Sequence, residues 1–190
     1  MYNLDHPNIV KVYHLIQIKS QLYMGMEIVK YGTLQKLILE KSKDSKITDF
    51  QGAKIMQAIC RAVAYIHDQG VIHRDLKTAN ILLDNPDDLD SIKIIDFGLC
   101  ERSLLMKVNE EPHAGTLIYM APEVASKLEY TKSVDIWALG IIMHLILTGE
   151  KHPFYEREKD SPESFKKKLA KLKTCVEPDP SFSWIAKNLF

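Results

Sequence analysis

The sequence predicts an α+β fold, in which a short β-rich segment precedes a mainly helical remainder. Two runs of β-forming residues occupy positions 8–18 and 22–28, and the turn Lys19-Ser20-Gln21 separates them as in an antiparallel hairpin. Residues 55–66 carry isoleucine and valine at helical spacing, which is typical of an amphipathic helix. Residues 133–148 are hydrophobic almost all round, so we expect this helix in the middle of the core.

Composition limits the class of protein. The chain has 190 residues, of which 46% are hydrophobic, enough for one sizeable core. Its formal net charge is 0, so composition predicts neither a nucleic-acid nor a membrane partner, and it does not indicate the oligomeric state. The longest apolar stretch, residues 136–147, is too short to span a bilayer. Three cysteines without C-x-x-C spacing fit reduced thiols, so we expect an intracellular, cytoplasmic protein.

The first helices are predicted from local signals. Gly32-Thr33-Leu34 marks the start of a short helix that reaches about Lys41. Thr48 is followed three residues later by Gln51, which predicts a capping box for the helix over residues 55–66. Gly70 then provides the stop, because glycine adopts the left-handed conformation that ends many helices.

The last predicted helices follow the core helix. Ser161-Pro162 predicts an N-cap with proline in the permitted first position. The expected buried stripe consists of Phe165, Leu169 and Leu172. Around it lie Lys166, Lys167, Lys168, Lys171 and Lys173. These lysines form either a docking patch for acidic partners or a solvated helix face, and the pattern favours the second. Pro178 and Pro180 break the chain before an apolar helix predicted over residues 182–190.

The residues with catalytic chemistry lie between positions 73 and 98. The stretch begins His73-Arg74-Asp75-Leu76-Lys77-Thr78-Ala79-Asn80. Asp75 and Lys77 are two residues apart, so in extended or loop backbone both side chains can lean toward one point. A carboxylate there can accept a proton from an attacking hydroxyl, and an ammonium can neutralise charge on a transferred phosphoryl group.

Asn80 and Asp96 add two hard oxygen ligands, the type that Mg²⁺ takes alongside phosphate oxygens. Two apolar runs, residues 81–83 and 92–95, lie between them and flank a polar turn. This pattern predicts a short hairpin that brings the four functional side chains together.

These motifs resemble the catalytic loop and the metal-binding loop of eukaryotic protein kinases of the serine/threonine type. H-R-D-L-K-x-x-N is followed in order by D-F-G and by Ala121-Pro122-Glu123. The resemblance implies a kinase-like fold with residues 1–28 as a remnant of the small-lobe sheet and 29–190 as the hinge and a truncated large lobe. It also implies transfer of a phosphoryl group from ATP to a serine or threonine of a protein substrate, with Asp75 as base and Lys77 on the phosphate. Mg²⁺ would be held by Asn80 and Asp96.

The resemblance extends to the nucleotide site. Met26-Glu27-Ile28-Val29 resembles the hinge between lobes, which implies that the adenine lies against the backbone of Glu27 and Val29. The Met26 side chain would guard the back of the pocket, although a plain core position is an equally good interpretation. Leu82 would form the floor of the adenine site.

Residues 115–123 resemble the platform that holds the substrate peptide, and with the core helix they are similar to the calcium/calmodulin-regulated branch. Thr116 would then hydrogen-bond near Asp75 and Lys77. Many relatives carry a phosphorylatable hydroxyl shortly before the platform, whereas residues 108–114 contain none. We hypothesise that Glu110 or Glu111 supplies the negative partner of Arg74 instead; the alternative is that both glutamates face water.

Two further residues are expected to be structural. By resemblance, Asp135 at the start of the core helix hydrogen-bonds the backbone of the catalytic loop, so its loss should affect folding as well as activity. His67 is interpreted as a satisfied structural histidine rather than a catalytic one.

Some family landmarks do not occur in the chain. The eight glycines never fall at G-x-G-x-x-G spacing, and there is no V-A-I-K strand lysine. Both landmarks cover and align the ATP phosphates in the family, so we expect little activity from residues 1–190 alone. The alternative is a non-catalytic, pseudokinase-like binding or scaffold module. Retention of the catalytic motifs favours the enzyme, while the missing phosphate loop favours the module for the chain as it stands.

Overall fold

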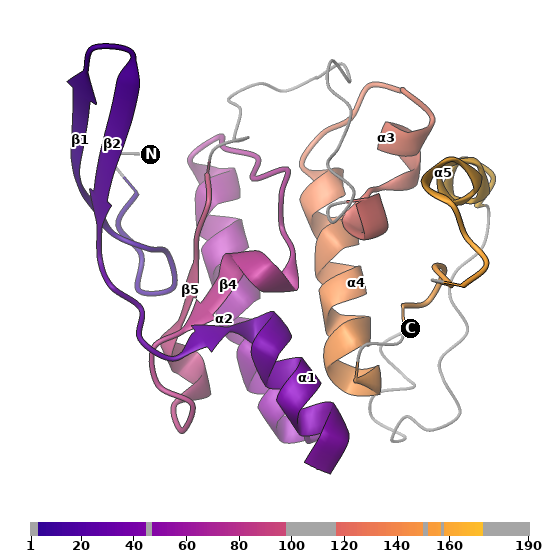
Figure 1. Cartoon of the computed structure of the whole chain (residues 1–190), viewed down its shortest axis with the longest axis horizontal. Helices are drawn as coiled ribbons and strands as arrows, with labels where there is room; N and C mark the ends of the chain where they lie inside the picture. Colours follow the sequence, from indigo (N-terminus) through magenta and orange to yellow (C-terminus); the bar gives the residue numbers. More distant parts are fainter. Residues whose placement is uncertain (1–3, 45–46, 98–116, 150–151, 157, 173–190) are drawn as a thin grey trace.

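A computed structural model describes residues 4–44, 47–97, 117–149, 152–156 and 158–172, and its elements confirm the α+β fold (Figure 1). The strands are β1 (Val12–Ile18), β2 (Gln21–Met26), β3 (Gly32–Thr33), β4 (Ile81–Leu83) and β5 (Ile92–Ile94). The helices are α1 (Leu34–Asp44), α2 (Asp49–Asp68), α3 (Pro122–Ala125), α4 (Ser133–Thr148) and α5 (Pro162–Ala170). Short 3-10 turns are η1 (Thr78–Asn80), η2 (Leu89–Ser91) and η3 (Leu117–Tyr119).

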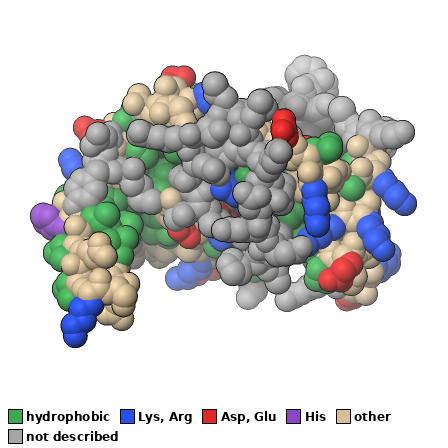
Figure 2. All heavy atoms as spheres, turned by 90° about the horizontal axis from the view of Figure 1, so that it is seen from above, with side chains coloured by type: hydrophobic (Ala, Val, Ile, Leu, Met, Phe, Trp, Pro, Cys, Tyr) green, Lys and Arg blue, Asp and Glu red, His purple; other side chains and the backbone are tan. Residues whose placement is uncertain are grey.

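The predicted N-terminal hairpin is formed by β1 and β2, which pair antiparallel with Ile18 opposite Gln21. Lys19 turns the chain with a φ of 56°, in the left-handed region. The second strand ends at Met26, two residues before the predicted end, and the side chain of Ile28 is 82% exposed. Figure 2 shows hydrophobic side chains gathered over this hairpin at one end of the molecule.

The first run of β-forming residues was predicted as one strand, and this prediction is wrong. The run consists of two segments that pair with different strands. The N–H of Val10 donates to the carbonyl of Ile94 at 3.0 Å, and the N–H of Ile94 donates to the carbonyl of Asn8 at 2.8 Å. The side-chain amide of Asn8 also donates to the carbonyls of Ile92 at 3.0 Å and Asp90 at 2.7 Å. These bonds hold residues 8–10 against β5, so only Val12–Ile18 remains for the hairpin.

The second sheet has the strand order β3-β4-β5, and its β4–β5 pair is the predicted hairpin. Gly32 and Thr33 pair with Leu83 and Leu82, so α1 begins at Leu34 and not at the predicted Gly32. The Thr33 hydroxyl accepts the N–H of Lys36 at 3.1 Å and caps the new helix start.

Helices α2 and α4 form the centre of the core. The capping box of α2 is confirmed: the Thr48 hydroxyl accepts the N–H of Gln51 at 3.2 Å, and the Gln51 side chain accepts the N–H of Thr48 at 3.0 Å. The two helices approach closely at Gly52, where an added Cβ would lie 3.2 Å from Cγ2 of Ile146. Most residues of α4 are buried, as predicted, although Ile136 is 57% exposed.

The N-cap and two of the three stripe residues predicted for α5 are confirmed, whereas Leu172 lies beyond the end of the helix and is half-buried. The Ser161 hydroxyl accepts the N–H of Ser164 at 3.2 Å, and Phe165 and Leu169 are fully buried. Lys167 and Lys171 are exposed, and Lys168 pairs with Asp160 at 3.5 Å. Lys173 and the helix predicted at 182–190 lie outside the described residues. No helix in the described part of the chain combines the length and the apolar character needed to cross a membrane.

Candidate active site

The loop between α2 and β4 brings three predicted site residues together. The ammonium of Lys77 lies 2.6 Å from Oδ2 of Asp75. The amide nitrogen of Asn80 donates to the same oxygen at 2.9 Å and to the backbone carbonyl of Asp75 at 2.9 Å. Asp75 is only 5% exposed, so its carboxylate is positioned by these two donors in a largely dry environment.

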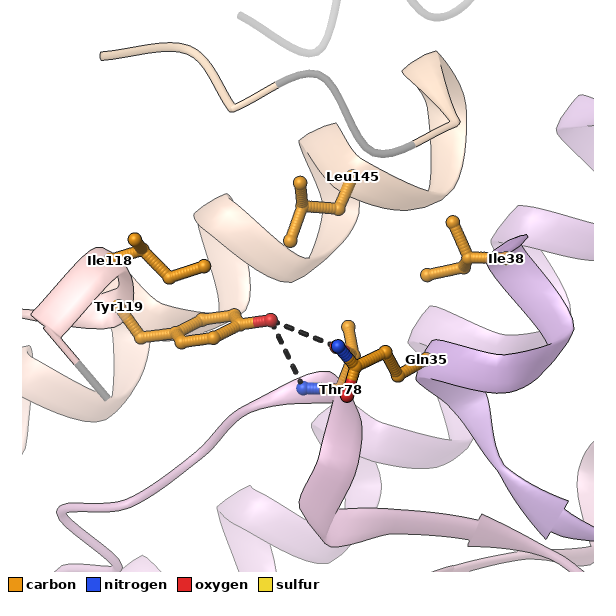
Figure 3. Close-up of a pocket in the computed structure, with 6 residues that line it drawn as sticks. All are labelled: Gln35, Ile38, Thr78, Ile118, Tyr119 and Leu145. Atoms are coloured by element: carbon orange, nitrogen blue, oxygen red, sulfur yellow. Dashed lines mark hydrogen bonds between the residues drawn. The ribbon is translucent and has the colours of Figure 1, made fainter. Parts of the chain in front are cut away.

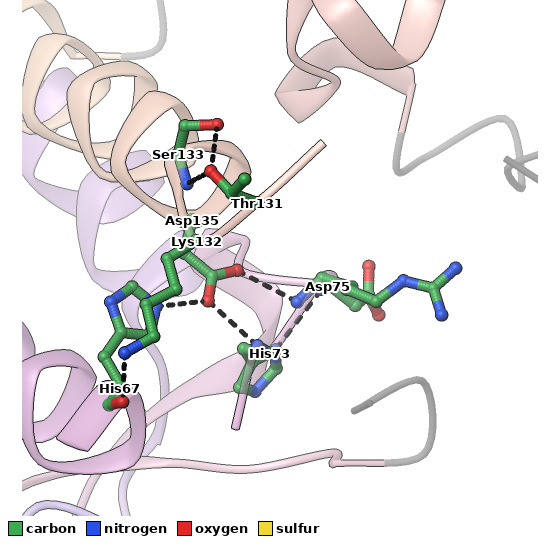
Figure 4. Close-up of polar contacts among 8 residues, drawn as sticks. His67, His73, Asp75, Thr131, Lys132, Ser133 and Asp135 are labelled. Carbon is green, nitrogen blue, oxygen red and sulfur yellow. Dashed lines mark hydrogen bonds and ion pairs between the residues drawn. The ribbon is translucent and has the colours of Figure 1, made fainter. Parts of the chain in front are cut away.

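Asp135, in the first turn of α4, holds this loop through its side chain (Figure 4). Its carboxylate accepts the backbone N–H groups of His73 at 2.8 Å and Arg74 at 2.9 Å. The ring of His67 lies 2.8 Å from the same carboxylate, which agrees with the structural role predicted for this histidine. Asp135 therefore ties α2, α4 and the loop to one point, and its bonds to the loop backbone are those that the resemblance implied.

The backbone is strained at two positions of the site: at Arg74, whose N–H donates to Asp135, and at Asp96 on the neighbouring segment. Arg74 has a φ of 69° and Asp96 a φ of 61°, both in the left-handed region that non-glycine residues rarely adopt. Each such residue costs on the order of 1–3 kcal/mol and persists only where its surroundings enforce it. The Arg74 guanidinium also lies 5.7 Å from the centre of the buried Tyr130 ring.

His73 joins the loop to the segment that carries Asp96. Its Nδ1 accepts the N–H of Asp75 at 3.3 Å, and its Nε2 donates to the carbonyl of Ile95 at 3.1 Å. Burial lowers the pKa of His73, against the opposing influence of nearby carboxylates, so the ring is neutral as this bonding requires. The N–H of Ile95 donates to the carbonyl of Asn80 at 2.9 Å. Ile95 is therefore bonded to both His73 and Asn80 of the loop, and Asp96 directly follows it. The Asp96 side chain is exposed.

The predicted hinge leads from β2 to β3, the strand that pairs with β4. The Glu27 carboxylate accepts the N–H of Lys11 at 2.8 Å and pairs with the ammonium of Lys93 at 3.0 Å. Met26 is 45% exposed, so in this structure it is not a plain core residue. Val29 and Leu82 are half-buried.

The described part of the predicted platform contacts the catalytic loop directly. The Tyr119 hydroxyl lies 2.8 Å from the Thr78 hydroxyl and accepts the N–H of Thr78 at 3.5 Å (Figure 3). Glu123 accepts the Ser133 hydroxyl at 2.9 Å. Thr116, Glu110 and Glu111 lie outside the described residues.

Comparison with known proteins identifies the family. Residues 1–189 match the family model described as a protein kinase domain. The chain belongs to the protein kinase family.

Several kinases resemble this family member. Calcium/calmodulin-dependent protein kinase type 1 of Macrobrachium nipponense is 39% identical over 155 residues, 80% of this chain and 43% of the relative. Calcium-dependent protein kinase 5 of Plasmodium berghei is 38% identical over 149 residues, 78% of this chain and 26% of the relative. Serine/threonine-protein kinase polo of Drosophila melanogaster is 33% identical over 180 residues, 95% of this chain and 29% of the relative. The chain therefore spans less than half the length of these kinases.

One histidine that supports the predicted platform was missed from the sequence. Nε2 of His152 donates to the carbonyl of Ile118 at 2.7 Å, while Nδ1 accepts the N–H groups of Phe154 at 3.1 Å and Tyr155 at 2.8 Å. The ring also packs edge-on against Phe165 of α5, with 5.7 Å between centroids. Burial lowers the pKa of His152 to about 4, so the ring stays neutral and keeps all three bonds. No periodic signal marks this residue, because its partners are set by tertiary packing.

Proposed function

We propose that the protein containing this chain transfers the γ-phosphoryl group of ATP to serine or threonine side chains of protein substrates. One observation carries the proposal: the buried Asp75 carboxylate is held by the Lys77 ammonium and the Asn80 amide in a loop that Asp135 clamps. The polo relative is named a serine/threonine-protein kinase, which supports the same class of acceptor.

Asp75 is the group that accepts the proton of the attacking hydroxyl, because a carboxylate held in place by two donors needs no reorganisation before it acts. Lys77 contributes positive charge at the same point, since its ammonium lies 2.6 Å from the Asp75 carboxylate. A phosphoryl group that approaches this carboxylate therefore also approaches a cation, which stabilises the developing negative charge.

The residues also fit a magnesium ion that is shared with phosphate. The Asn80 amide uses its nitrogen for both bonds to Asp75, which leaves its oxygen as a hard ligand, and the Asp96 carboxylate is exposed. Among the described residues no group of three or more His, Cys, Asp or Glu side chains could hold a metal ion, which favours shared coordination over an all-protein cage. Bound Mg²⁺ would neutralise and orient the phosphate oxygens.

For the nucleotide, we propose that the adenine lies against the backbone of Glu27 and Val29, above Leu82 and beside Met26. Among the described residues the N–H of Val29 takes part in no backbone hydrogen bond, so it is a suitable donor for a purine ring. The partial exposure of Met26 and Leu82 suits a wall and a floor that a ligand would cover. Thr116 remains a predicted contact near Asp75 and Lys77.

Residues 1–190 on their own should show little phosphoryl transfer and weak ATP affinity, because no glycine loop or strand lysine is present in their sequence. A non-catalytic binding module is the second candidate. The lack of a glycine loop and a strand lysine in residues 1–190 favours it for the isolated chain. The chain spans 43% or less of the relatives described above, so activity is assigned to the full-length protein.

The test compares the full-length protein with its Asp75→Asn variant in an assay of labelled phosphate transfer to a protein mixture. We expect labelled phosphoserine or phosphothreonine from the wild type, and a loss of about 10²–10⁴-fold in Asp75→Asn. Asp87→Asn is the matched control, because Asp87 is an exposed carboxylate in the turn between β4 and β5. Equal activity in Asp75→Asn would refute the role of Asp75 as the base, and a folded wild type without transfer would favour the binding module.

A further inference from the structure

A second, smaller hydrophobic core lies beside the described part of the predicted platform. It consists of Leu117 and Met120 of the platform and Phe165 and Leu169 of α5, all of them buried. Leu76 of the catalytic loop belongs to the main core instead, together with residues of α2 and α4. Figure 1 shows α3 and α5 together, at the end of the molecule opposite β1 and β2. This part of the platform is therefore supported by packing that is separate from the packing around the catalytic loop.

The segment between α4 and α5 adds aromatic rings to the small core. Tyr155 lies edge-on to Phe165, with 5.1 Å between the ring centroids. Phe154 stacks on Trp137 of α4 at 5.6 Å. The ring of His152 lies edge-on to Phe165 at 5.7 Å and to Tyr155 at 6.2 Å. Such edge-on contacts are favourable arrangements of aromatic rings, so the position of the His152 ring is fixed by its neighbours.

Both nitrogens of the fixed His152 ring form hydrogen bonds, and the two sets of bonds lead in different directions. Nε2 donates to the carbonyl of Ile118 in the platform at 2.7 Å. Nδ1 accepts the N–H groups of Phe154 at 3.1 Å and Tyr155 at 2.8 Å, which belong to the same segment as the histidine. Only a neutral ring can form all of these bonds, because an imidazolium has no acceptor. The ring thus joins the platform to the segment that precedes α5.

The bond to Ile118 fixes the platform on the side away from the catalytic loop. Tyr119 directly follows Ile118 in η3, and its hydroxyl lies 2.8 Å from the hydroxyl of Thr78 in the loop. The Asp75 carboxylate is held by donors of the loop itself and not by the platform. Loss of the bond from His152 should therefore displace the platform and leave the base in place.

We propose that His152 is a positioning residue for the protein substrate, because its bond to the Ile118 carbonyl fixes the platform against which the substrate peptide lies. The inference rests on the proposed function. It adds to that function a residue, remote from the nucleotide and from the reacting atoms, that determines the affinity for the peptide and leaves the chemical step unaltered.

Two substitutions separate the roles of the two ring nitrogens. The amide of His152→Asn lies where Nδ1 lies in histidine, so it can still accept from Phe154 and Tyr155 but does not reach the Ile118 carbonyl. The amide of His152→Gln extends to the place of Nε2 and can still donate to that carbonyl. His14→Asn is the matched control, because His14 is an exposed histidine of β1.

The first experiment measures steady-state kinetics of the full-length protein with a peptide that the wild type phosphorylates, chosen from a serine/threonine peptide library. For His152→Asn we expect the KM for the peptide to rise about tenfold, with kcat and the KM for ATP within about twofold of the wild type. His152→Gln should recover most of this loss, and His14→Asn should match the wild type. Equal peptide KM values in the Asn and Gln variants, or a fall in kcat alone, would overturn the proposal.

A second experiment needs no activity and separates this proposal from the proposed function. The backbone amides of Ile118, Tyr119 and Thr78 are followed by NMR, with His73 of the catalytic loop as the reference. In His152→Asn the first three should shift and the amide of His73 should not, whereas His152→Gln should leave all four near their wild-type positions. If these shifts occur but the wild type phosphorylates no peptide, the role of His152 in the platform stands and the proposed function fails. If the platform amides do not move, the proposal fails even for an active kinase.

The wild type itself provides a measurement that does not depend on the folding of a variant. A scalar coupling is expected across the hydrogen bond from Nε2 of His152 to the Ile118 carbonyl. Absence of this coupling, with the Nε2 proton observed, would overturn the proposal even if His152→Asn did not fold.

Discussion

Removal of the Asp135 carboxylate is the most informative perturbation of the catalytic loop. In the wild type this carboxylate is 1% exposed and accepts bonds from His67, His73 and Arg74 at 2.8–2.9 Å. Asp135→Ala leaves two backbone N–H groups and a histidine ring without their acceptor. It also releases the clamp that enforces the left-handed conformation of Arg74.

The size of the effect follows from the number of orphaned donors. A buried donor without a partner costs about 1–3 kcal/mol, so three donors set an upper range of about 3–9 kcal/mol. Water that enters the space left by the side chain can hydrogen-bond some of these donors, so the cost should lie below the top of that range. Loss of one member of a buried pair typically costs about 3–5 kcal/mol. We therefore expect the free energy of unfolding to fall by about 4 kcal/mol. Domains are commonly stable by about 5–15 kcal/mol, so the variant should fold but be markedly weakened.

Urea unfolding and amide hydrogen exchange measure this directly. The amides of His73 and Arg74 should lose more protection than the global loss of stability accounts for, because their acceptor has gone. Ile136→Ala is the control on the same helix: its side chain is 57% exposed, so it should change stability by about 0.5 kcal/mol or less. A loss below about 1 kcal/mol in Asp135→Ala, or unchanged exchange at both amides, would refute this account of the clamp.

Two other predictions concern stability. Burial lowers the pKa of His152 from 6.5 to about 4, so between these pH values the unfolded chain binds a proton at this residue and the folded chain does not. The free energy of unfolding should therefore keep its full value above pH 6.5 and fall by about 2–3 kcal/mol as the pH drops to 4. His152→Gln should flatten this part of the urea-unfolding profile, and an unchanged slope would contradict the assignment. Thr48→Ala removes the hydroxyl half of the α2 capping box and should lower the unfolding free energy by about 1 kcal/mol, whereas no change would show that the cap adds nothing.

The features that could be predicted from sequence are those whose causes are local. The Thr48–Gln51 box involves residues three apart, and the β4–β5 hairpin is bounded by its own polar turn. The grouping of Asp75, Lys77 and Asn80 is similarly local, because all three lie within six residues of one loop.

The features that were missed depend on distant partners. Asn8 bonds the carbonyl of Asp90, 82 residues away, and this contact divides a run that looks like one continuous strand. Gly32 joins a sheet with Leu83, although its local sequence is typical of a helix start. His152 supports Ile118, 34 residues earlier, and no spacing in the sequence relates the two.

The central claim is that Asp75, Asn80 and Asp96 converge on the metal-bound phosphates of a nucleotide. The most direct measurement is paramagnetic broadening by Mn²⁺, in place of Mg²⁺, added with ATP to the full-length protein and followed by NMR. The Asn80 side-chain amide and the backbone amides of Asp75 and Asp96 should broaden strongly, and Asp87 in the distant turn should not. Nucleotide-dependent broadening that spares Asn80 and Asp96, or that affects Asp87 equally, would contradict the claim.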